Sequence, residues 1–462
     1  MATPTTSFNG TDEITALAGL INSAVQDIIR EYTMTGHSVP SLHSTEEGPF
    51  DAPHLVSAAL SKAIQTVEAA CAQLTFTVAN PGHTITNKAY AYEEPACMLV
   101  VTNAKIADLL IEKPEGLSVK DLAAASGLDS GKLCRILRLL ATKHCFEEVR
   151  PDVFANNRLS MQLVSTNPVS SLVGTMTDES LKAAAYLNDT LMDSKTGTST
   201  SADDSPFQRA HGVSFFAFYT TPIGKKRFAQ AMVGWGEVTG RSMLPKVYDW
   251  DNVPTDTIIC DVGGGNGHAT LRLTKEFPKL KVVLQDLPAV IKQGKEYWLA
   301  EYPEAVEKQR IQFAELDFFV GQPVENCDLY YVRFLIVWND ADKSIGVLAA
   351  TCPVGQHLSI LRNVRKSMSH GSRLLIHEFV IQHAVRDPNA NTSATDEAPE
   401  PLLANYGVAR IRKYNQDLNM MVLLNSQERT LQDFITLGEK SGFRFEKLWD
   451  SGEAGLIEFS TA

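Results

Sequence analysis

A glycine-rich segment is the part of this sequence best suited to chemistry on a ligand. It reads DVGGGNG from Asp261 to Gly267, after an apolar run and before a helical pattern that begins near Ala269. A strand, a glycine turn and a helix N-terminus bring backbone N–H groups close to a ligand, and glycine is needed because a Cβ would block the approach. A nucleotide-like ligand, a dinucleotide included, would suit this loop.

Two aspartates later in the chain narrow the choice of ligand. Asp286 ends the apolar run VVLQD, about 20 residues beyond the glycines, where a carboxylate can accept hydrogen bonds from both hydroxyls of a ribose. Asp317 ends a third run, where its side chain and the aromatic residue after it could hold an adenine ring. Either aspartate could instead cap the helix that follows its strand. Together with the glycine loop, the two favour an adenosyl site.

The elements that would position these residues form an α/β domain. From about residue 248, short β-rich runs alternate with helical segments, which indicates a parallel sheet wound with crossovers. We expect one domain over residues 248–462, with 384–403 as an exposed loop inside it. The runs are TIICDVG, KVVLQDL, IQFAELDF, DLYYVRF and SRLLIHEFVI.

The first half of the chain has a helical pattern instead. We expect residues 1–52 to form a flexible, partly helical extension, 53–200 a compact domain and 201–247 a helical linker. The Ser/Thr-rich stretch 194–205 reads as a solvated loop.

A winged-helix outline lies within residues 53–200. Two short helices separated by Gly127 precede a small β-wing around Phe146–Phe154. The second helix of such a module can read DNA in a major groove. Here that helix, from Lys132 to Lys143, carries a broad apolar stripe. Dimerisation or covering of a substrate is therefore favoured over DNA reading.

Composition limits the partners further. The net charge of −12 and the absence of a basic block argue against nucleic acid. No run of about 18 apolar residues predicts a membrane span, and no basic leader opens the chain, so we expect a cytoplasmic protein. Seven cysteines without a CxxC pair predict neither a disulfide framework nor a zinc site, and we expect them to be reduced and mostly buried.

The motifs DVGGGNG, LQDLP, LDFF, YYVRF, LLIHEF and NSQERT, in this order and spacing, resemble the plant caffeate-type O-methyltransferases and their fungal relatives. The resemblance covers roughly residues 55–462. It implies a Rossmann-like class I methyltransferase domain preceded by a mainly α-helical winged-helix dimerisation domain. It also implies a homodimer, S-adenosyl-L-methionine as cofactor, no metal, and methyl transfer to a hydroxyl of a small aromatic or polyketide-like acceptor.

The resemblance assigns roles to single residues. Those matching the cofactor contacts are Asp261, Gly263, Gly265, Asp286, Leu287, Asp317, Phe318 and Arg333. Those matching the acceptor pocket are Phe216, Met232, Trp235, Trp338, Asp417 and Met420. For Phe216, Met232 and Met420, ordinary helix core explains the pattern equally well. The helices of residues 201–247 would supply part of that pocket.

The catalytic base of this family is missing. Relatives carry a histidine in a His-Asp-Trp phrase to take the hydroxyl proton, and two carboxylates orient it. Glu378 and Glu428 match the carboxylates, but Val337 stands where the histidine should be, with one residue fewer before Trp338. An insert of roughly a dozen residues within 343–357 follows at once.

Three explanations of the missing histidine and the adjacent insert remain open. Exon boundaries could be misassigned in the gene of an ordinary methyltransferase, and genomic DNA that contains a spliceable intron here would show it. The enzyme could be remodelled, with an acidic acceptor or with His357 or His377 as base, although we expect His377 to point away from Glu378 because strand side chains alternate. Alternatively, the chain could bind the cofactor without transferring methyl, as in fungal relatives that steer pericyclic reactions.

Overall fold

The computed structural model describes residues 9–220, 222–240, 242–335, 356–386, 396–450 and 452–462. The chain divides into two compact units: unit 1 consists of Met1–Lys182 and Phe218–Val238, and unit 2 of Ala183–Ala217 and Thr239–Ala462. The segment 201–247, predicted to be a helical linker, is therefore divided: residues 218–238 belong to unit 1, and the residues before and after them belong to unit 2.

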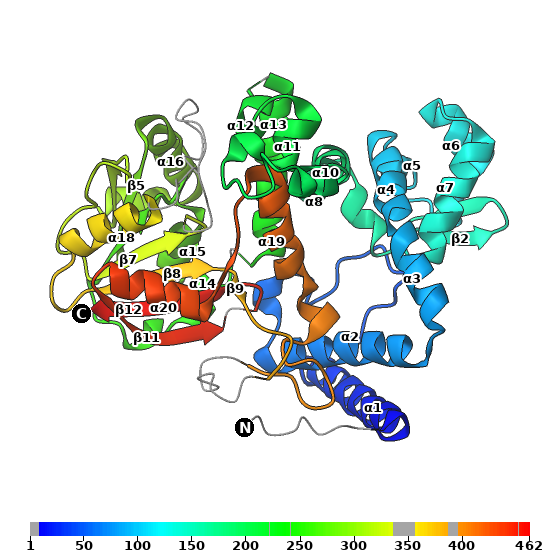
Figure 1. Ribbon diagram of the computed structural model, residues 1–462, viewed down its shortest axis with the longest axis horizontal. Coiled ribbons are helices and arrows are strands. Elements are labelled where there is room, and N and C mark those ends of the chain that lie inside the picture. The colour runs from blue at the N-terminus through cyan, green and yellow to red at the C-terminus, as the bar shows by residue number, and fades with distance from the viewer. Residues whose placement is uncertain (1–8, 221, 241, 336–355, 387–395, 451) are drawn as a thin grey trace. The chain divides into compact units, whose positions relative to one another are not determined.

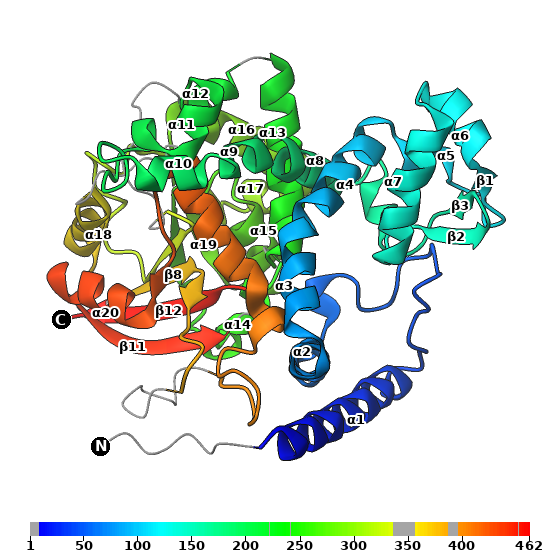
Figure 2. The same ribbon diagram turned by 45° about the vertical axis from the view of Figure 1, so that its right-hand side comes forward.

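Unit 1 begins with two long helices, α1 (Gly10–Met34) and α2 (Ala58–Val78), that pack along each other (Figure 2). Asn9 caps α1 by accepting hydrogen bonds from the backbone of Thr11 and Asp12, and Ser57 caps α2 in the same way. The next elements are α3 (Pro81–Ala89), the short 3-10 turn η2 (Tyr90–Tyr92), α4 (Glu93–Asn103) and α5 (Ile106–Leu109); another 3-10 turn, η1 (Pro53–Leu55), precedes α2.

The predicted pair of short helices and the β-wing are both present. The first helix, α6 (Val119–Ser126), ends at Gly127, whose φ of +73° suits glycine. The second, α7 (Ser130–Thr142), starts where the Asp129 side chain accepts the Lys132 N–H. The wing strands β2 (Glu147–Arg150) and β3 (Val153–Ala155) join β1 (Leu117–Ser118) in a three-stranded sheet. The core between helices and wing holds Leu133, Leu137, Leu140, Phe146 and Phe154.

Unit 1 is completed by a helix from later in the chain. After η3 (Ser160–Leu163), helix α8 (Pro168–Thr175) runs into a π-helical turn, η4 (Met176–Ser180). Helix α13 (Pro222–Val238) packs along α8. The helices α9 (Leu181–Ala184) and α12 (Phe215–Phe218) lie where the chain passes between the units.

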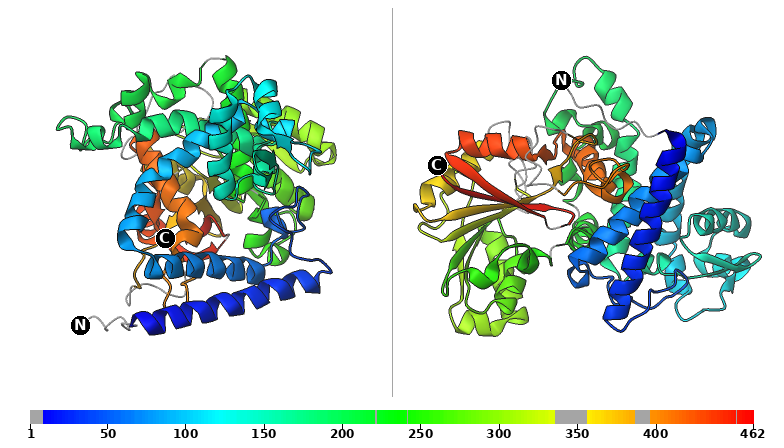
Figure 3. Two further views of the ribbon diagram at one scale, coloured as in Figure 1. Left: turned by 90° about the vertical axis from the view of Figure 1, so that its right-hand side faces the viewer. Right: turned by 90° about the horizontal axis from the view of Figure 1, so that it is seen from below.

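Unit 2 is built on a seven-stranded sheet with strand order β11-β12-β8-β7-β4-β5-β6 (Figure 1). The predicted runs form β4 (Ile258–Val262), β5 (Lys281–Asp286), β6 (Ile311–Glu315), β7 (Leu329–Arg333) and β8 (Arg373–Glu378), which are all parallel. The prediction of parallel strands is confirmed for these five runs, and the sheet has two further strands that were not predicted. The strands β11 (Phe443–Asp450) and β12 (Gly455–Thr461) form an antiparallel hairpin at one edge, drawn in red in Figure 3.

Helices cover both faces of this sheet. On one face, α14 (Leu244–Val247), α15 (His268–Glu276) and α16 (Pro288–Glu301) pack on strand residues such as Ile259, Tyr331 and Leu375. On the other, α18 (Gln356–Ser367) and α20 (Leu431–Lys440) pack on Cys260 and Ile376. The remaining elements are η5 (Ala202–Asp204), η6 (Trp250–Asn252), η7 (Gly407–Arg410), α10 (Leu187–Met192), α11 (Pro206–His211), α17 (Pro303–Glu307), α19 (Ile411–Leu424) and the short strands β9 (Val380–Ile381) and β10 (Arg429–Thr430).

The loop predicted to be exposed over residues 384–403 is not exposed throughout its described part. Ala398 and Leu402 are buried, because backbone hydrogen bonds from Ala404 to Ala384 and from Ala398 to Ala404 fold the segment back on itself. Ala398 and Leu402 are thus core residues of a compact loop, whereas Val385 (73%) and Leu403 (50%) are exposed. Among the described helices, none is long and apolar enough to span a membrane.

Candidate functional site

The glycine loop joins β4 to α15, and two of its glycines meet different demands. Gly263, at φ +68°, has no room for a side chain, since a Cβ would lie 2.6 Å from Leu335 Cδ1 and 3.1 Å from Phe318 Cε1. Gly265 also has a left-handed backbone, at φ +63°, but a Cβ there would meet no described atom within 4 Å. The loop is therefore packed below Gly263 and open at Gly265, as a cradle for a ligand requires.

The Asp286 carboxylate closes this cradle from the next strand. Its Oδ2 accepts the Gly265 N–H at 2.9 Å, and its Oδ1 accepts the Leu287 N–H at 2.7 Å. Burial raises the pKa of Asp286, while these two backbone donors lower it. Each carboxylate oxygen keeps a second lone pair, so the group can still accept hydrogen bonds from a ligand's hydroxyls.

Asp261, predicted as a cofactor contact, is turned beneath the loop. Its Oδ2 accepts the Thr270 hydroxyl at 2.7 Å, and a Cβ on Gly264 would lie 2.4 Å from its Cγ. Complete burial, opposed by the Thr270 hydrogen bond, raises the pKa of Asp261 to about 7. In this position the carboxylate ties the loop to the first turn of α15.

A tryptophan supports the far end of the loop. Trp298 of α16 donates its indole N–H to the Asn266 carbonyl at 3.1 Å, and a Cβ on Gly267 would lie 2.5 Å from that nitrogen. Gly267 is thus required by packing. Sequence reasoning missed both Thr270 and Trp298, whose only signal is their place on the helices beside the loop.

The third strand ends beside the same loop. Asp317 is exposed, and its Oδ1 accepts the Phe319 N–H at 3.0 Å. Phe318 is buried, and Asn363 of α18 holds its carbonyl at 3.2 Å. Arg333, at the end of β7, has its guanidinium 4.5 Å from the Phe334 ring.

The two predicted catalytic carboxylates lie together. The strands β9 and β10 pair in parallel, with Arg429 opposite Val380, which brings Glu428 beside Glu378. Both side chains are buried, and Asp417 of α19 accepts the Glu428 N–H at 2.7 Å. Burial, and after it the negative charges of Glu378 and Asp417, raise the pKa of Glu428 well above its ordinary value.

His377 does point away from Glu378, as alternation along the strand predicted. Its Nδ1 lies 2.8 Å from the Tyr331 hydroxyl, on the opposite face of the sheet. Burial and the neighbouring Arg333 charge hold its pKa well below the usual range, so it stays neutral. Val337, Trp338 and most of the 343–357 insert lie outside the described residues, and so does the His357 side chain.

The residues predicted to line the acceptor pocket divide between the units. Phe216, Asp417 and Met420 belong to unit 2, where Phe216 and Met420 are buried. Met232 and Trp235 are half-buried on α13 of unit 1. Their joint role as a pocket stays a prediction.

The remaining groups that could take part in chemistry are metal-ligating side chains and cysteines. The described part of the chain has no group of three His, Cys, Asp or Glu side chains placed to hold a metal ion. Six of the seven cysteines are described, all are free thiols, and four of them are buried, as predicted.

Comparison with known proteins gives the family. Residues 185–444 match the model of the O-methyltransferase domain, and residues 88–166 match the O-methyltransferase dimerisation domain. The chain belongs to the O-methyltransferase family. The predicted two-part fold and S-adenosylmethionine as methyl donor are thereby confirmed at the level of the family.

Relatives of this O-methyltransferase include fungal enzymes over nearly their whole length. The 3-O-methyltransferase 2 of Phanerochaete chrysosporium is 47% identical over 97% of both chains. The O-methyltransferase tpcA of Aspergillus fumigatus is 31% identical over 96% of this chain and 94% of its own. Sterigmatocystin 8-O-methyltransferase of Aspergillus flavus is 27% identical over 83% of each chain.

Solved structures share the fold at lower identity. The mitomycin 7-O-methyltransferase MmcR has a TM-score of 0.62 at 23% identity, over 82% of this chain and 98% of its own. LepI in complex with SAM has a TM-score of 0.66 at 17% identity, over 96% and 99%. At these identities the likeness concerns architecture alone.

Proposed function

We propose that this O-methyltransferase binds S-adenosylmethionine at the β4–α15 loop and methylates a hydroxyl of a small aromatic or polyketide-like acceptor. The observation that carries the proposal is the cradle itself, in which Gly265 leaves open space and Asp286 is fixed at its rim. Asp286 would accept the ribose hydroxyls, and Leu287, Asp317 and Phe318 would border the adenine. Gly263, Asp261 and Arg333 are the other residues predicted to contact the cofactor. Asp261 would act indirectly, since its carboxylate supports the loop from below.

When bound, the cofactor supplies an electrophilic methyl group on a positively charged sulfur. The chain's own task is to orient the acceptor hydroxyl and take its proton. Among the described residues, Glu378 and Glu428 are the groups proposed for the proton, because they are buried side by side and Glu428 Oε2 has no hydrogen-bond donor in the described structure. Glu428 can take this proton only while it is ionised, and its raised pKa then makes it a stronger base than an ordinary carboxylate.

The class of acceptor is proposed from the relatives. The names of the Phanerochaete and Aspergillus enzymes specify methylation on oxygen, at a numbered position, and in one case on sterigmatocystin. Buried Phe216 and Met420 would suit a flat, apolar acceptor. We further propose that the protein acts as a cytoplasmic homodimer, since a dimerisation domain precedes the catalytic one.

The proposal is tested by incubating the purified chain with methyl-labelled cofactor and a panel of phenols and catechols. We expect labelled ether products, and we expect Gly265→Ala to weaken cofactor binding at least about tenfold in calorimetry, because its Cβ would enter the cradle. Gly127→Ala is the matched control: it has the same left-handed backbone and equally open surroundings at the end of α6.

Two results would contradict the proposal in different ways. If the Gly265→Ala and Gly127→Ala variants bound the cofactor with equal affinity, the β4–α15 loop would not be the cofactor-binding site. Tight cofactor binding without transfer to any acceptor would refute methylation and favour a protein that uses the bound cofactor in another way.

A further inference from the structure

Helix α7 of unit 1 has apolar side chains on a second face, beside the one that the core covers. Leu133 and Leu137 are fully buried in the core between the helices and the wing. Ile136 and Leu139 lie on the next face around the helix and are half-buried. A helix that only covers a core needs a single apolar stripe. The wider stripe of α7 therefore indicates a second packing surface.

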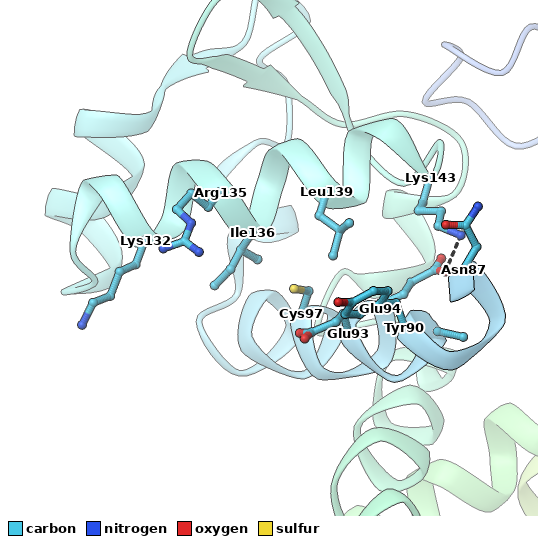
Figure 4. A pocket seen from close by; sticks show the side chains of 11 residues that line it. Asn87, Tyr90, Glu93, Glu94, Cys97, Lys132, Arg135, Ile136, Leu139 and Lys143 are labelled. Carbon is cyan, nitrogen blue, oxygen red and sulfur yellow. Dashed lines mark ion pairs between the residues drawn. The ribbon is translucent and has the colours of Figure 1, made fainter. Parts of the chain in front are cut away.

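A groove of about 700 Å³ lies along this second face. Figure 4 shows α7 on one side of the groove and η2 with α4 on the other. Side chains three or four positions apart lie on one face of a helix. The α7 residues that line the groove have this spacing: Lys132, Arg135, Ile136, Leu139 and Lys143.

The two sides of the groove carry opposite charges. Lys132 and Arg135 are exposed on the α7 side, and Glu93 is exposed on the α4 side. At one end the two sides are joined by an ion pair, with Lys143 Nζ 3.6 Å from a Glu94 carboxylate oxygen (Figure 4). A nucleic acid would be attracted by the α7 side but repelled by the α4 side and by the net charge of −12.

Between the charged sides the groove is apolar. Ile136 and Leu139 line it from α7, and Tyr90 and Cys97 line it from the other side. Burial, and after it the negative charges of two neighbouring glutamates, raise the pKa of the Cys97 thiol, which therefore stays neutral. An apolar centre between two charged sides is complementary to an amphipathic helix laid into the groove.

We propose that this groove is a docking site for an amphipathic helix of another protein, which completes a three-helix bundle with α4 and α7. From Lys132 to Lys143 the groove extends about 17 Å at 1.5 Å per residue, so about three turns of the partner fit. The partner's apolar residues lie on Ile136 and Leu139. Its edge toward α7 is acidic and its edge toward α4 is basic, as in the charge pairing of coiled-coil helices. This inference is independent of methyl transfer.

The proposal is tested with three fluorescent synthetic peptides of about four helical turns that share one apolar face. The first has one acidic and one basic edge, the second two acidic edges, and the third two basic edges. We expect the first to bind the full chain at least about tenfold more tightly than the others in fluorescence anisotropy. If the third bound as tightly as the first, the chain's net negative charge would be the attraction and the proposal would be wrong.

A double variant tests whether the peptide lies in this groove. Lys132→Glu/Arg135→Glu makes both sides acidic, so we expect the peptide with two basic edges to become the tightest ligand. Damage to the fold would weaken all three peptides and would not produce this reversal. Lys292→Glu/Lys295→Glu, with the same charge change at the same spacing on exposed residues of α16, is the matched control and should keep the natural order of affinities. The natural order in Lys132→Glu/Arg135→Glu would overturn the proposal.

Two other occupants of the groove are distinguished by further measurements. In light scattering, binding of the first peptide should add only its own mass to the protein. A fall to half the mass would assign the groove to a second copy of this chain. An unlabelled DNA duplex should not displace the peptide, and displacement would assign the groove to nucleic acid. Either result would overturn docking of a partner helix.

Discussion

At the scale of single residues, Glu378 and Glu428 place two carboxyl groups close together in the interior of unit 2. Both carboxylates are buried, and burial together with the negative charges of Glu378 and Asp417 raises the pKa of Glu428, which favours its protonated form. In relatives such a pair is expected to orient a positively charged or hydrogen-bonding histidine. In the described part of this chain the nearest histidine in sequence, His377, faces the other side of the sheet.

This environment makes stability depend on pH in a definite direction. The pKa of Glu428 is higher in the folded than in the unfolded chain, so the folded state holds a proton that the unfolded state releases. Folding is therefore progressively disfavoured as the pH rises above the ordinary glutamate range, until the raised pKa is passed. Glu428→Gln, which is always neutral, should gain melting temperature relative to the natural chain between pH 5 and pH 8, by at least about 2 °C.

Glu307→Gln, at an exposed carboxylate at the end of α17, is the control and should show no such trend. The measurement is thermal unfolding followed by circular dichroism at several pH values. A difference that stays constant with pH, or that falls as the pH rises, would mean that Glu428 is ionised in the folded chain and held by a cation.

The residues of the cradle were predictable to different degrees. Gly263, Gly265 and Asp286 could be found because backbone geometry and strand ends leave a pattern in nearby sequence. Thr270 and Trp298 could not, since their partners, Asp261 and the Asn266 carbonyl, are defined only by how the helices pack. Asp261 was assigned correctly to the loop, but its carboxylate supports the loop from below.

At the scale of elements, α8 and α13 approach each other unusually closely. Gly234 of α13 lies against the chain at Pro168, where a Cβ would come within 2.5 Å of the Pro168 carbonyl oxygen. Arg227 of the same helix pairs with Glu179 at 3.2 Å. The glycine thus sets the distance between the helices, and the ion pair ties α13 to the π-helical turn η4 that follows α8.

This close approach reverses the usual effect of replacing a helical glycine. Gly→Ala in a helix normally stabilises by roughly 1 kcal/mol. We expect Gly234→Ala to destabilise instead, by about 1–3 kcal/mol, because backbone atoms must move to admit the new carbon. Gly19→Ala in α1, where a Cβ would meet no described atom within 4 Å, should stabilise by the usual amount. Urea denaturation of both variants measures the two changes in the free energy of unfolding. If Gly234→Ala were stabilising, α8 and α13 would be further apart than the structure shows.

Most elements could be predicted from periodicity and composition, including the wing and the five parallel strands. The antiparallel hairpin was missed although the sequence held a signal. β11 ends at Asp450 and β12 begins at Gly455, and so short a connection cannot cross over to a parallel neighbour. The length of this connection therefore predicts an antiparallel pair.

At the scale of the whole molecule, unit 1 is discontinuous in sequence, because α13 joins it from residues 218–238. We therefore expect a fragment of residues 1–182 to lack stable tertiary structure, since the face of α8 that packs on α13 would be exposed. The same fragment with residues 218–238 appended through a Gly/Ser linker should fold. Near-UV circular dichroism and gel filtration compare the tertiary structure and the compactness of the two fragments. If both fragments were equally folded, α13 would be dispensable for unit 1.

The passage of the chain between the two units has a consequence for how such enzymes can be recombined. The chain passes from one unit to the other three times, after Lys182, after Ala217 and after Val238. A chimera of two relatives with a single junction at residue 182 would place α8 of one parent beside α13 of the other, with a Gly234 contact that neither parent had selected. A chimera of such enzymes should keep a stable unit 1 only when residues 218–238 come from the same parent as residues 1–182, so the transferable module is defined by contact and not by continuity of the gene.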